Sequence, residues 1–308
     1  DLGSGSLRVE PIDEADVRRY LLGSGLAAKI YYQEMDPALD PLDPGSPLLA
    51  MNGLLTGTFS PTGCRSSWCG RSPLTGIWNE ANMGGHWGAE LRFAGVDGLI
   101  ITGRAPEPVY LWLHDGQAEI RPAGHVWGLE HFDVFEGLRA ETDPKAQVAC
   151  IGPAGEKLVR LAGVMQGGQD HARSGARGGM GALMGSKNLK AIVARGSDRP
   201  QYPDTKAFRA FVQEINGFIK ENSLGLSQLG TPGGVIATEL TGDLPLKNWT
   251  LGSWKEEAAR ISGQRMAATL FSKHTHCFAC PIGCGKNIKI DEGPYAGVQG
   301  HGPEYETL

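Results

Sequence analysis

Residues 176–195 read Ala176-Arg-Gly-Gly-Met-Gly-Ala-Leu-Met-Gly-Ser-Lys-Asn-Leu-Lys-Ala-Ile-Val-Ala-Arg195. The glycine-flanked stretch 181–185 predicts a helix start or a tight turn, because glycine adopts left-handed backbone angles at little steric cost. The apolar run 191–195 is short and predicts a buried strand. In such a loop, successive backbone N–H groups can also converge on an anion such as phosphate. Taken alone, the stretch therefore indicates a structural turn and a ligand cradle equally.

A second segment has the same character, since Asn82-Met-Gly84-Gly85-His-Trp-Gly88-Ala-Glu90 places glycines beside polar side chains. Neither segment has the order GxxxxGK[ST] of a P-loop. The stretch Gly185-Ser-Lys187 has serine and lysine in the opposite order to the end of that pattern. Neither lies in a clear strand, GxGxxG, helix unit with an acid roughly 20 residues later, so a nicotinamide site has little support. Arg65 and Arg177 add planar cations suited to phosphate or to a pterin ring edge, although an isolated arginine is usually a solvated surface charge.

Short runs bounded by Gly, Pro and Asp dominate the chain before residue 200 and predict a sheet-rich region. The tetrapeptide His114-Asp-Gly-Gln117 predicts a hairpin, since Asp-Gly tolerates the positive φ angles of a tight turn. Beyond Pro200 the apolar spacing is helical, and we place a domain boundary there, between residues 1–200 and 201–308. The predicted strands are 7–11, 48–55, 98–102, 109–114, 117–121, 147–151, 158–164 and 191–195, and the predicted helices are 13–35, 133–141, 208–222 and 264–271.

Three of the six cysteines lie close together, in the order Cys277-Phe-Ala-Cys280-Pro-Ile-Gly-Cys284. A tight turn can direct thiolates at this spacing toward one metal centre, and an iron–sulfur cluster is the favoured interpretation. A structural zinc site is an alternative, and it needs a fourth ligand such as His274 or His276. A disulfide knot and free buried thiols are less favoured interpretations of the same spacing.

A [4Fe–4S] cluster held by cysteine takes four thiolates, and no cysteine follows Cys284 in this sequence. The fourth ligand is expected beyond residue 308, with a return of Cys64, Cys69 or Cys150 to the cluster as the alternative. Taken singly, these three residues are more often small core residues than ligands.

Composition and charge limit the classes of function. Glycine supplies 45 of the 308 residues, about twice the usual share of roughly 7%, which indicates close backbone approach to a cofactor or many tight turns. The net charge of -5 is spread along the chain, so nucleic acid is not an expected partner. We find no apolar run of about 18 residues and no signal peptide at Asp1-Leu-Gly-Ser4, so we expect a cytoplasmic protein outside the membrane.

Seven segments, in one order, are together similar to the tungsten-containing aldehyde ferredoxin oxidoreductase family along nearly the whole chain. Such an ordered set is hard to obtain by chance, and the last three segments are the most specific. The segments are 55–58 with Pro61-Thr-Gly-Cys-Arg65, Arg71-Ser-Pro-Leu-Thr-Gly76, Ala81-Asn-Met-Gly-Gly85 with 88–91, Ile151-Gly-Pro-Ala-Gly-Glu156, 177–191, 277–285 and Gly302-Pro-Glu-Tyr-Glu306.

The resemblance implies an α+β fold. An N-terminal domain of two β-sheets would form the base for a bis-pterin tungsten cofactor, and the start of a mostly helical domain would follow. It also implies a Mg²⁺ ion held by the backbone carbonyls of Asn82 and Ala176. The cysteines Cys277, Cys280 and Cys284 would hold a [4Fe–4S] cluster. The residues implied to contact the pterin cofactor are Arg65, Asn82, Gly84, Gly85, Ala176, Arg177, Gly178 and Gly179.

By the same resemblance the protein is a tungsten-dependent enzyme that oxidises a small aldehyde to a carboxylic acid. Electrons would pass through the cluster to ferredoxin or to an iron–sulfur partner subunit, and an oligomer is expected. Glu306 matches the family's carboxylate near the metal and is the predicted acid/base. Glu304 is a further candidate, and Tyr305 would orient the substrate or only pack.

Three functions other than aldehyde oxidation are alternatives. A related enzyme of the same family would act on a hydroxycarboxylate or an aromatic acyl thioester, and no residue distinguishes tungsten from molybdenum. A non-catalytic electron-transfer subunit would hold only the cluster, although it would not need two phosphate-type cradles. A zinc-binding interaction module is the third.

Overall fold

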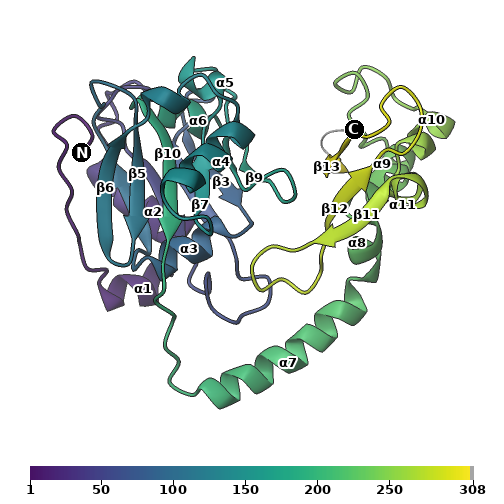
Figure 1. Cartoon of the computed structure of the whole chain (residues 1–308), viewed down its shortest axis with the longest axis horizontal. Helices are drawn as coiled ribbons and strands as arrows, with labels where there is room; N and C mark the ends of the chain where they lie inside the picture. The colour runs from purple at the N-terminus through teal and green to yellow at the C-terminus, as the bar shows by residue number, and fades with distance from the viewer. Residues whose placement is uncertain (306–308) are drawn as a thin grey trace. The chain divides into compact units, whose positions relative to one another are not determined.

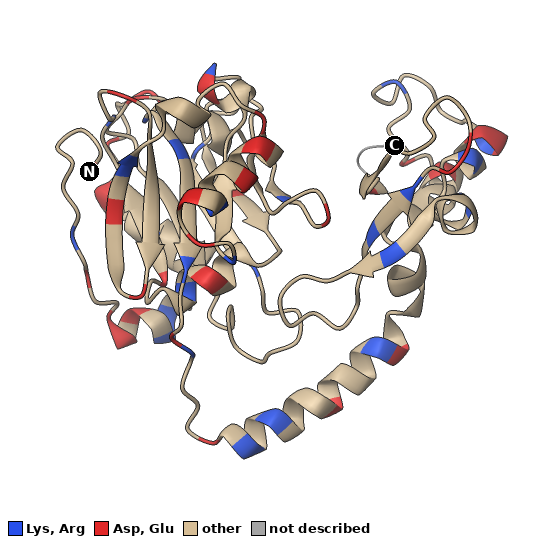
Figure 2. Cartoon of the chain, in the orientation of Figure 1, with Lys and Arg blue, Asp and Glu red and all other residues tan. Residues whose placement is uncertain are grey.

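The structure is a computed structural model that describes residues 1–305 (Figure 1). It contains two compact units, of which the first combines Asp1–Gly168 with Ala172–Thr205. The second unit combines Gln169–His171 with the chain from Lys206 onward. Lys/Arg and Asp/Glu residues are interspersed within each unit (Figure 2). Within residues 1–305, no helix combines the length and the apolarity needed to cross a membrane.

The first unit contains a four-stranded antiparallel sheet in the order β3-β2-β1-β4. Side chains of its two faces alternate along each strand, so Leu49, Met51 and Cys69 point to one face and pack against Ala27 and Tyr31 of a helix. That helix is α2 (Ser24–Glu34). The strands are β1 (Leu48–Asn52), β2 (Ser66–Arg71), β3 (Trp78–Met83) and β4 (Gly98–Ile101).

A second, six-stranded sheet has the order β6-β5-β10-β7-β8-β9 and is antiparallel except between β5 and β10. Helix α4 (His131–Glu141) covers one face with Val134, Phe135 and Leu138. Two sheets in the N-terminal part, as predicted, are thereby confirmed. The strands are β5 (Val109–His114), β6 (Gln117–Pro122), β7 (Gln147–Cys150), β8 (Val164–Gln166), β9 (Arg173–Gly175) and β10 (Leu189–Arg195).

The remaining faces of the two sheets share one hydrophobic core. Helix α3 (Trp87–Phe93) joins them, because the ring of Trp87 lies 5.1 Å from that of Trp68 on β2 and its indole N–H donates to the Ile192 carbonyl on β10 at 2.9 Å. Helix α6 (Met180–Gly185) contributes Met180, Leu183 and Met184 to the same core. Shorter helices α1 (Glu14–Tyr20), η1 (Gly124–Val126) and α5 (Pro153–Glu156) complete the first unit.

Three local predictions are wrong. Residues 7–11 form no strand, and Val9 is 94% exposed, because no neighbouring strand pairs with this segment. The single helix expected over 13–35 is two helices, since Leu21 at φ 60° and Gly23 at φ 64° break the right-handed turn between them. Residues 158–163 form turns, and only the last residue of the predicted strand 158–164 begins β8.

The second unit consists of the 18-residue helix α7, several short helices and a three-stranded sheet in the order β11-β12-β13. Its core contains Val235, Leu244 and Ala258. The sheet was not predicted, because its strands are short and mostly polar. The elements are α7 (Thr205–Asn222), α8 (Leu224–Leu229), η2 (Thr231–Gly234), α9 (Val235–Thr241), α10 (Lys255–Arg260), α11 (Gly263–Thr269), β11 (Phe271–Thr275), β12 (Gly285–Lys289) and β13 (Gln299–His301).

Two lysines of segment 177–191 are fully buried in the first unit. The ammonium of Lys187 donates to the carbonyls of Pro44 at 2.9 Å and Ser46 at 2.6 Å, and so fixes the proline-rich loop before β1. Lys190 forms an ion pair with Glu156, whose side chain is 5% exposed, and also donates to the Leu129 carbonyl at 3.0 Å. These two lysines therefore have structural partners within the fold.

Burial lowers the pKa of Lys187 to about 8 from 10.5. Because the unfolded chain then binds more protons between these two values, Lys187 makes the free energy of unfolding rise with pH across that window. We expect the difference between wild type and Lys187→Met to shift by up to about 3 kcal/mol in favour of wild type from pH 8 to pH 10.5. Urea unfolding at several pH values measures it, and a constant difference would contradict the prediction.

Candidate functional site

The two glycine-rich segments meet where two sheet edges come together. Strand β3 is the edge of the four-stranded sheet and leads into residues 82–85, whereas β9 is the edge of the six-stranded sheet and leads into residues 176–179. The two strands are in contact (Figure 1). A Cβ on Gly175 would lie 3.7 Å from that of Ala81. The side-chain amide of Asn79 on β3 donates to the Arg177 carbonyl at 3.1 Å, across 98 residues of sequence.

Gln166 on β8 contacts the glycine segment at residues 82–85. Its side chain is fully buried, and its amide donates to the Gly84 carbonyl at 3.1 Å. Its side-chain oxygen is buried without a hydrogen-bond partner in the structure. Gly85 has φ 96°, and a Cβ there would lie 1.5 Å from the Gln166 nitrogen, so only glycine fits. Sequence reasoning missed Gln166, because a single glutamine carries no pattern that predicts its burial.

The second glycine segment is fixed by equally close contacts. Gly178 and Gly179 have φ 69° and 81°, which is the left-handed region. A Cβ on Gly178 would lie 2.0 Å from the Asn79 side-chain oxygen, and one on Gly179 would lie 2.1 Å from the Arg160 carbonyl oxygen. The glycines thus allow the backbone of residues 176–179 to lie against neighbouring chain segments.

Four of the residues predicted for a pterin site lie on the surface around this junction. Arg65, Asn82, Ala176 and Arg177 are all exposed. Two hydrogen bonds fix the backbone of Arg65, because its carbonyl accepts from the Gly53 N–H at 3.1 Å and from the Thr56 hydroxyl at 2.6 Å. Exposed cations beside two rigid glycine segments fit a large anionic cofactor such as a phosphorylated pterin. The roles of these residues toward a ligand stay predictions.

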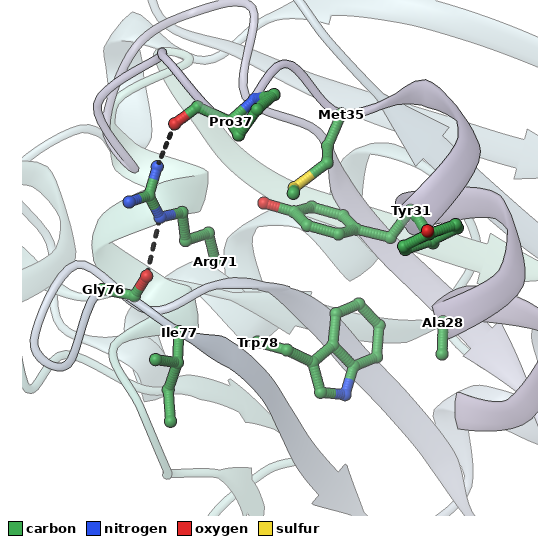
Figure 3. A pocket seen from close by; sticks show the side chains of 9 residues that line it. Ala28, Tyr31, Met35, Pro37, Arg71, Gly76, Ile77 and Trp78 are labelled. Atoms are coloured by element: carbon green, nitrogen blue, oxygen red, sulfur yellow. Dashed lines mark hydrogen bonds between the residues drawn. The ribbon is translucent and has the colours of Figure 1, made fainter.

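A separate cavity of about 460 Å³ lies between α2 and the loop that joins β2 to β3 (Figure 3). Tyr31 and Trp78 face each other there, with ring centroids 5.2 Å apart. Arg71 lines the cavity, but its guanidinium donates hydrogen bonds to the carbonyl oxygens of Gly76 at 2.7 Å and Leu39 at 2.8 Å. The family segment 71–76 therefore has a structural explanation, namely that Arg71 closes this loop.

The cysteine segment forms one irregular loop between β11 and β12 in the second unit. Cys277, Cys280 and Cys284 are partly exposed, and no cysteine within residues 1–305 forms a disulfide. The loop turns through left-handed backbone angles at Ala279, φ 51°, and Gly283, φ 64°. Within residues 1–305, no group of three or more His, Cys, Asp or Glu side chains is arranged to hold a metal ion. Three partly exposed thiols on one loop nevertheless fit a cubane cluster, because each cysteine binds a different iron.

Histidines and one lysine surround the cysteine loop. His171 Nε2 lies 4.0 Å from Cys277 Sγ, and His276 Nδ1 lies 3.0 Å from the Cys280 carbonyl oxygen. Lys286, only 2% exposed, lies directly beyond the loop. Burial lowers the pKa of Lys286, whereas negative charge at Cys284 and Glu304 raises it. Sequence reasoning missed Lys286, because a lysine on a short polar strand gives no sign of burial.

The three remaining cysteines lie in the first unit. Cys69 and Cys150 are fully buried in its hydrophobic cores, and burial raises the pKa of each thiol to about 12. Cys64 is 4% exposed. The surroundings of Cys69 and Cys150 fit small core residues rather than thiolate ligands, because a buried thiol with a raised pKa stays protonated and inert.

Alkylation of the metal-free native chain at pH 8 is therefore expected to modify Cys277, Cys280 and Cys284 rapidly and Cys69 and Cys150 slowly or not at all. Accessibility and thiolate fraction together control the rate. Peptide mass spectrometry after a timed iodoacetamide pulse measures it, with urea-unfolded chain as the control in which all six cysteines react. Rapid labelling of Cys69 or Cys150 would argue against a rigid native core.

The proposed catalytic segment follows β13, which pairs with β12 immediately beyond the cysteine loop. The N–H of Gly302 donates to the Lys286 carbonyl at 2.8 Å. Glu304 accepts from the Thr231 hydroxyl at 2.8 Å, and the N–H of Tyr305 donates to the same hydroxyl oxygen at 2.9 Å. The ring of Tyr305 packs against the core of the second unit. Glu306, the predicted acid/base, lies outside the described residues.

Two family models match the chain. The aldehyde ferredoxin oxidoreductase N-terminal domain matches residues 1–196, and domains 2 and 3 of the same family match residues 210–308. The chain therefore belongs to the aldehyde ferredoxin oxidoreductase family. The resemblance deduced from the seven sequence segments is confirmed.

Individual relatives in this family are similar to the chain along its whole length. The tungsten-containing aldehyde ferredoxin oxidoreductase of Pyrococcus furiosus is 40% identical over 312 residues, which covers 100% of this chain and 50% of the relative. A P. furiosus aliphatic sulfonate oxidoreductase WOR-like subunit is 29% identical over 99% of this chain and 51% of its own length. The chain spans about half the length of the curated relatives it matches.

A solved structure has the same fold. The active site complex BamBC of benzoyl coenzyme A reductase, in complex with 1,5-dienoyl-CoA, superimposes with a TM-score of 0.82 at 30% identity. The match covers 98% of this chain and 47% of that chain. The α+β fold class is therefore confirmed, and it occurs in relatives that are named for different substrates.

Proposed function

We propose that this chain carries the pterin base and the cysteine loop of a tungsten-dependent oxidoreductase that converts small aldehydes to carboxylic acids. The observation that carries this proposal is the junction of β3 and β9, which brings the two glycine segments together beside exposed arginines. Tungsten-containing aldehyde enzymes at 40% identity over the full chain support the choice of substrate class.

Each part of the site has a proposed task. Arg65, Arg177 and the backbone of Gly84, Gly85, Gly178 and Gly179 would hold the pterin phosphates and rings, and the carbonyls of Asn82 and Ala176 would bind Mg²⁺. When bound, the dithiolene-ligated metal would supply two-electron chemistry, and the protein would supply position and hydrogen bonds. The loop cysteines Cys277, Cys280 and Cys284 would bind a [4Fe–4S] cluster, from which ferredoxin or an iron–sulfur subunit accepts electrons.

Proton transfer is assigned to the carboxylate of Glu306. Conversion of an aldehyde and water to a carboxylic acid releases two electrons and two protons. A carboxylate next to the carbonyl can accept a proton as water attacks, and such general-base catalysis contributes roughly 10²–10⁴-fold. Glu306→Gln is therefore expected to lower turnover by about this factor while tungsten and iron contents stay unchanged. Unchanged turnover at intact metal content would remove Glu306 from the mechanism.

Metal and pterin analysis of the full-length protein, purified without oxygen, tests the function. Mass spectrometry for W, Mo, Fe, Zn and Mg, with pterin fluorescence after oxidation, should give about one tungsten and about four irons per chain. A panel of aldehydes with a viologen dye as acceptor should then show turnover. Iron without tungsten, molybdenum or pterin would instead indicate an electron-transfer subunit.

The fold match to the BamBC complex supports one second candidate, namely action on an aromatic acyl thioester. The same preparation discriminates between the two. Dye reduction by aldehydes with no activity toward aromatic acyl-CoA compounds supports the aldehyde enzyme, and the reverse result supports the second candidate.

A further inference from the structure

Lys286 is a buried cation directly beneath the cysteine loop. Its side chain is 2% exposed, although strand β12 that carries it is short. The Nζ atom lies 3.0 Å from the Gly283 carbonyl oxygen, 3.2 Å from that of Cys284 and 2.6 Å from that of Ser227 on α8. Lys286 thus connects the end of the cysteine loop to a helix that lies about 60 residues earlier in the chain.

The hydrogen bonds around Lys286 indicate a full positive charge. An ammonium has three N–H donors, and the three carbonyl oxygens accept one each. His274 Nδ1 lies 3.2 Å from Nζ and also 3.2 Å from the Gly283 carbonyl oxygen. If Nδ1 carries the hydrogen, it donates to the second lone pair of the Gly283 carbonyl, and every polar group is satisfied. The three carbonyl oxygens around Nζ match the three N–H donors of an ammonium, whereas a neutral amine has only two N–H groups.

We propose that Lys286 is a positioning residue of the cysteine loop and that its charge raises the reduction potential of the cluster bound there. The inference rests on the proposed function, because it requires a cluster at Cys277, Cys280 and Cys284. By holding the carbonyls of Gly283 and Cys284, the ammonium fixes the backbone that presents the third thiolate.

The electrostatic effect has a definite sign. Reduction adds one negative charge to the cluster, and a fixed positive charge nearby stabilises the reduced form. With an effective dielectric constant of about 20, a unit charge acting over about 10 Å changes an equilibrium by more than tenfold. Burial prevents solvent and salt from screening this charge as they screen an exposed lysine.

Redox titrations of the full-length holoprotein, followed by the EPR signal of the reduced cluster, test the inference. The variants are Lys286→Gln, which keeps N–H donors without the charge, and Lys286→Arg, which keeps the charge. Lys289→Gln is the matched control, because Lys289 lies on the same strand but is 57% exposed, and its ion-pair partner Asp291 is exposed too. Iron content and thermal stability are measured for each variant.

We expect Lys286→Gln to lower the equilibrium constant for cluster reduction at least tenfold, which is about 59 mV for one electron. Lys286→Arg and Lys289→Gln should stay near wild type. A wild-type potential in Lys286→Gln, or an equal shift in Lys289→Gln, would overturn the inference. Lys286→Gln can also lose its iron. In that case, a Lys286→Arg variant that keeps its iron and its reduction potential supports the inference. Loss of iron from Lys286→Arg as well overturns the role of charge. Wild-type protein without a cluster would instead refute the proposed function.

Discussion

Glu156→Ala is expected to lower the free energy of unfolding by about 3–5 kcal/mol, because it leaves a buried lysine without its counter-charge. Lys190 is fully buried, and Glu156 is its ion-pair partner. The Glu156 carboxylate also accepts from the Gly128 N–H at 2.9 Å and 3.0 Å, so the substitution releases that loop as well. Denaturant unfolding followed by tryptophan fluorescence measures the loss.

Two further variants separate burial from charge pairing. The double variant Glu156→Leu with Lys190→Met replaces the ion pair by apolar groups of similar size and should recover most of the loss. Glu14→Ala breaks the exposed pair with Arg18, whose side chains are both 77% exposed, and should change stability too little to measure. Equal losses from Glu156→Ala and Glu14→Ala would contradict the assignment of a buried structural ion pair.

Cys280→Ser in the full-length protein is expected to remove most of the cluster iron and its visible absorbance. Serine lacks the soft thiolate that iron–sulfur clusters require, and Cys280 is the central cysteine of the loop. Iron and acid-labile sulfide analysis after anaerobic purification measures the loss. The test depends on the proposed function and requires no activity assay.

Cys150→Ala is the control for this experiment. Cys150 is fully buried in the first unit and has a thiol pKa of about 12, so its replacement should leave the iron content unchanged. Loss of iron from Cys150→Ala, with Cys280→Ser unaffected, would show that the ligands have been misassigned. Equal iron loss in both variants would indicate that the fold, rather than a ligand, had been damaged.

Sequence patterns correctly predicted those elements whose backbone conformation is set by residues within the element itself. The hairpin at His114 to Gln117 is present, with Asp115 and Gly116 at φ 42° and 80°, because few other residue pairs adopt two positive φ angles. The strand Val109–His114 matches its prediction at both ends. Strands β2 and β3 were missed, because their sequences are rich in polar and small residues and resemble loops.

Sequence patterns also failed to predict which charged residues are buried. Lys187, Lys190 and Lys286 are ordinary surface residues in any composition-based view, and yet all three are at least 98% buried. Their burial is possible because carbonyls or a carboxylate satisfy their donors. Lys286 has two of its partners close by, at Gly283 and Cys284, but the other partners come from residues 44–46, 129, 156 and 227, so no short window of sequence contains the whole set.

Residue order alone was enough to identify the family by its ordered motifs and the cysteine loop by its spacing, and the family resemblance in turn implied the two-sheet N-terminal part. Tertiary structure was needed to show that the segments after β3 and β9 lie together, that Cys69 and Cys150 are core residues, and that Lys286 lies beneath the cysteine loop. The physical reason is that packing joins groups up to 143 residues apart through shared burial and hydrogen bonds, so the partner of each group depends on the whole core.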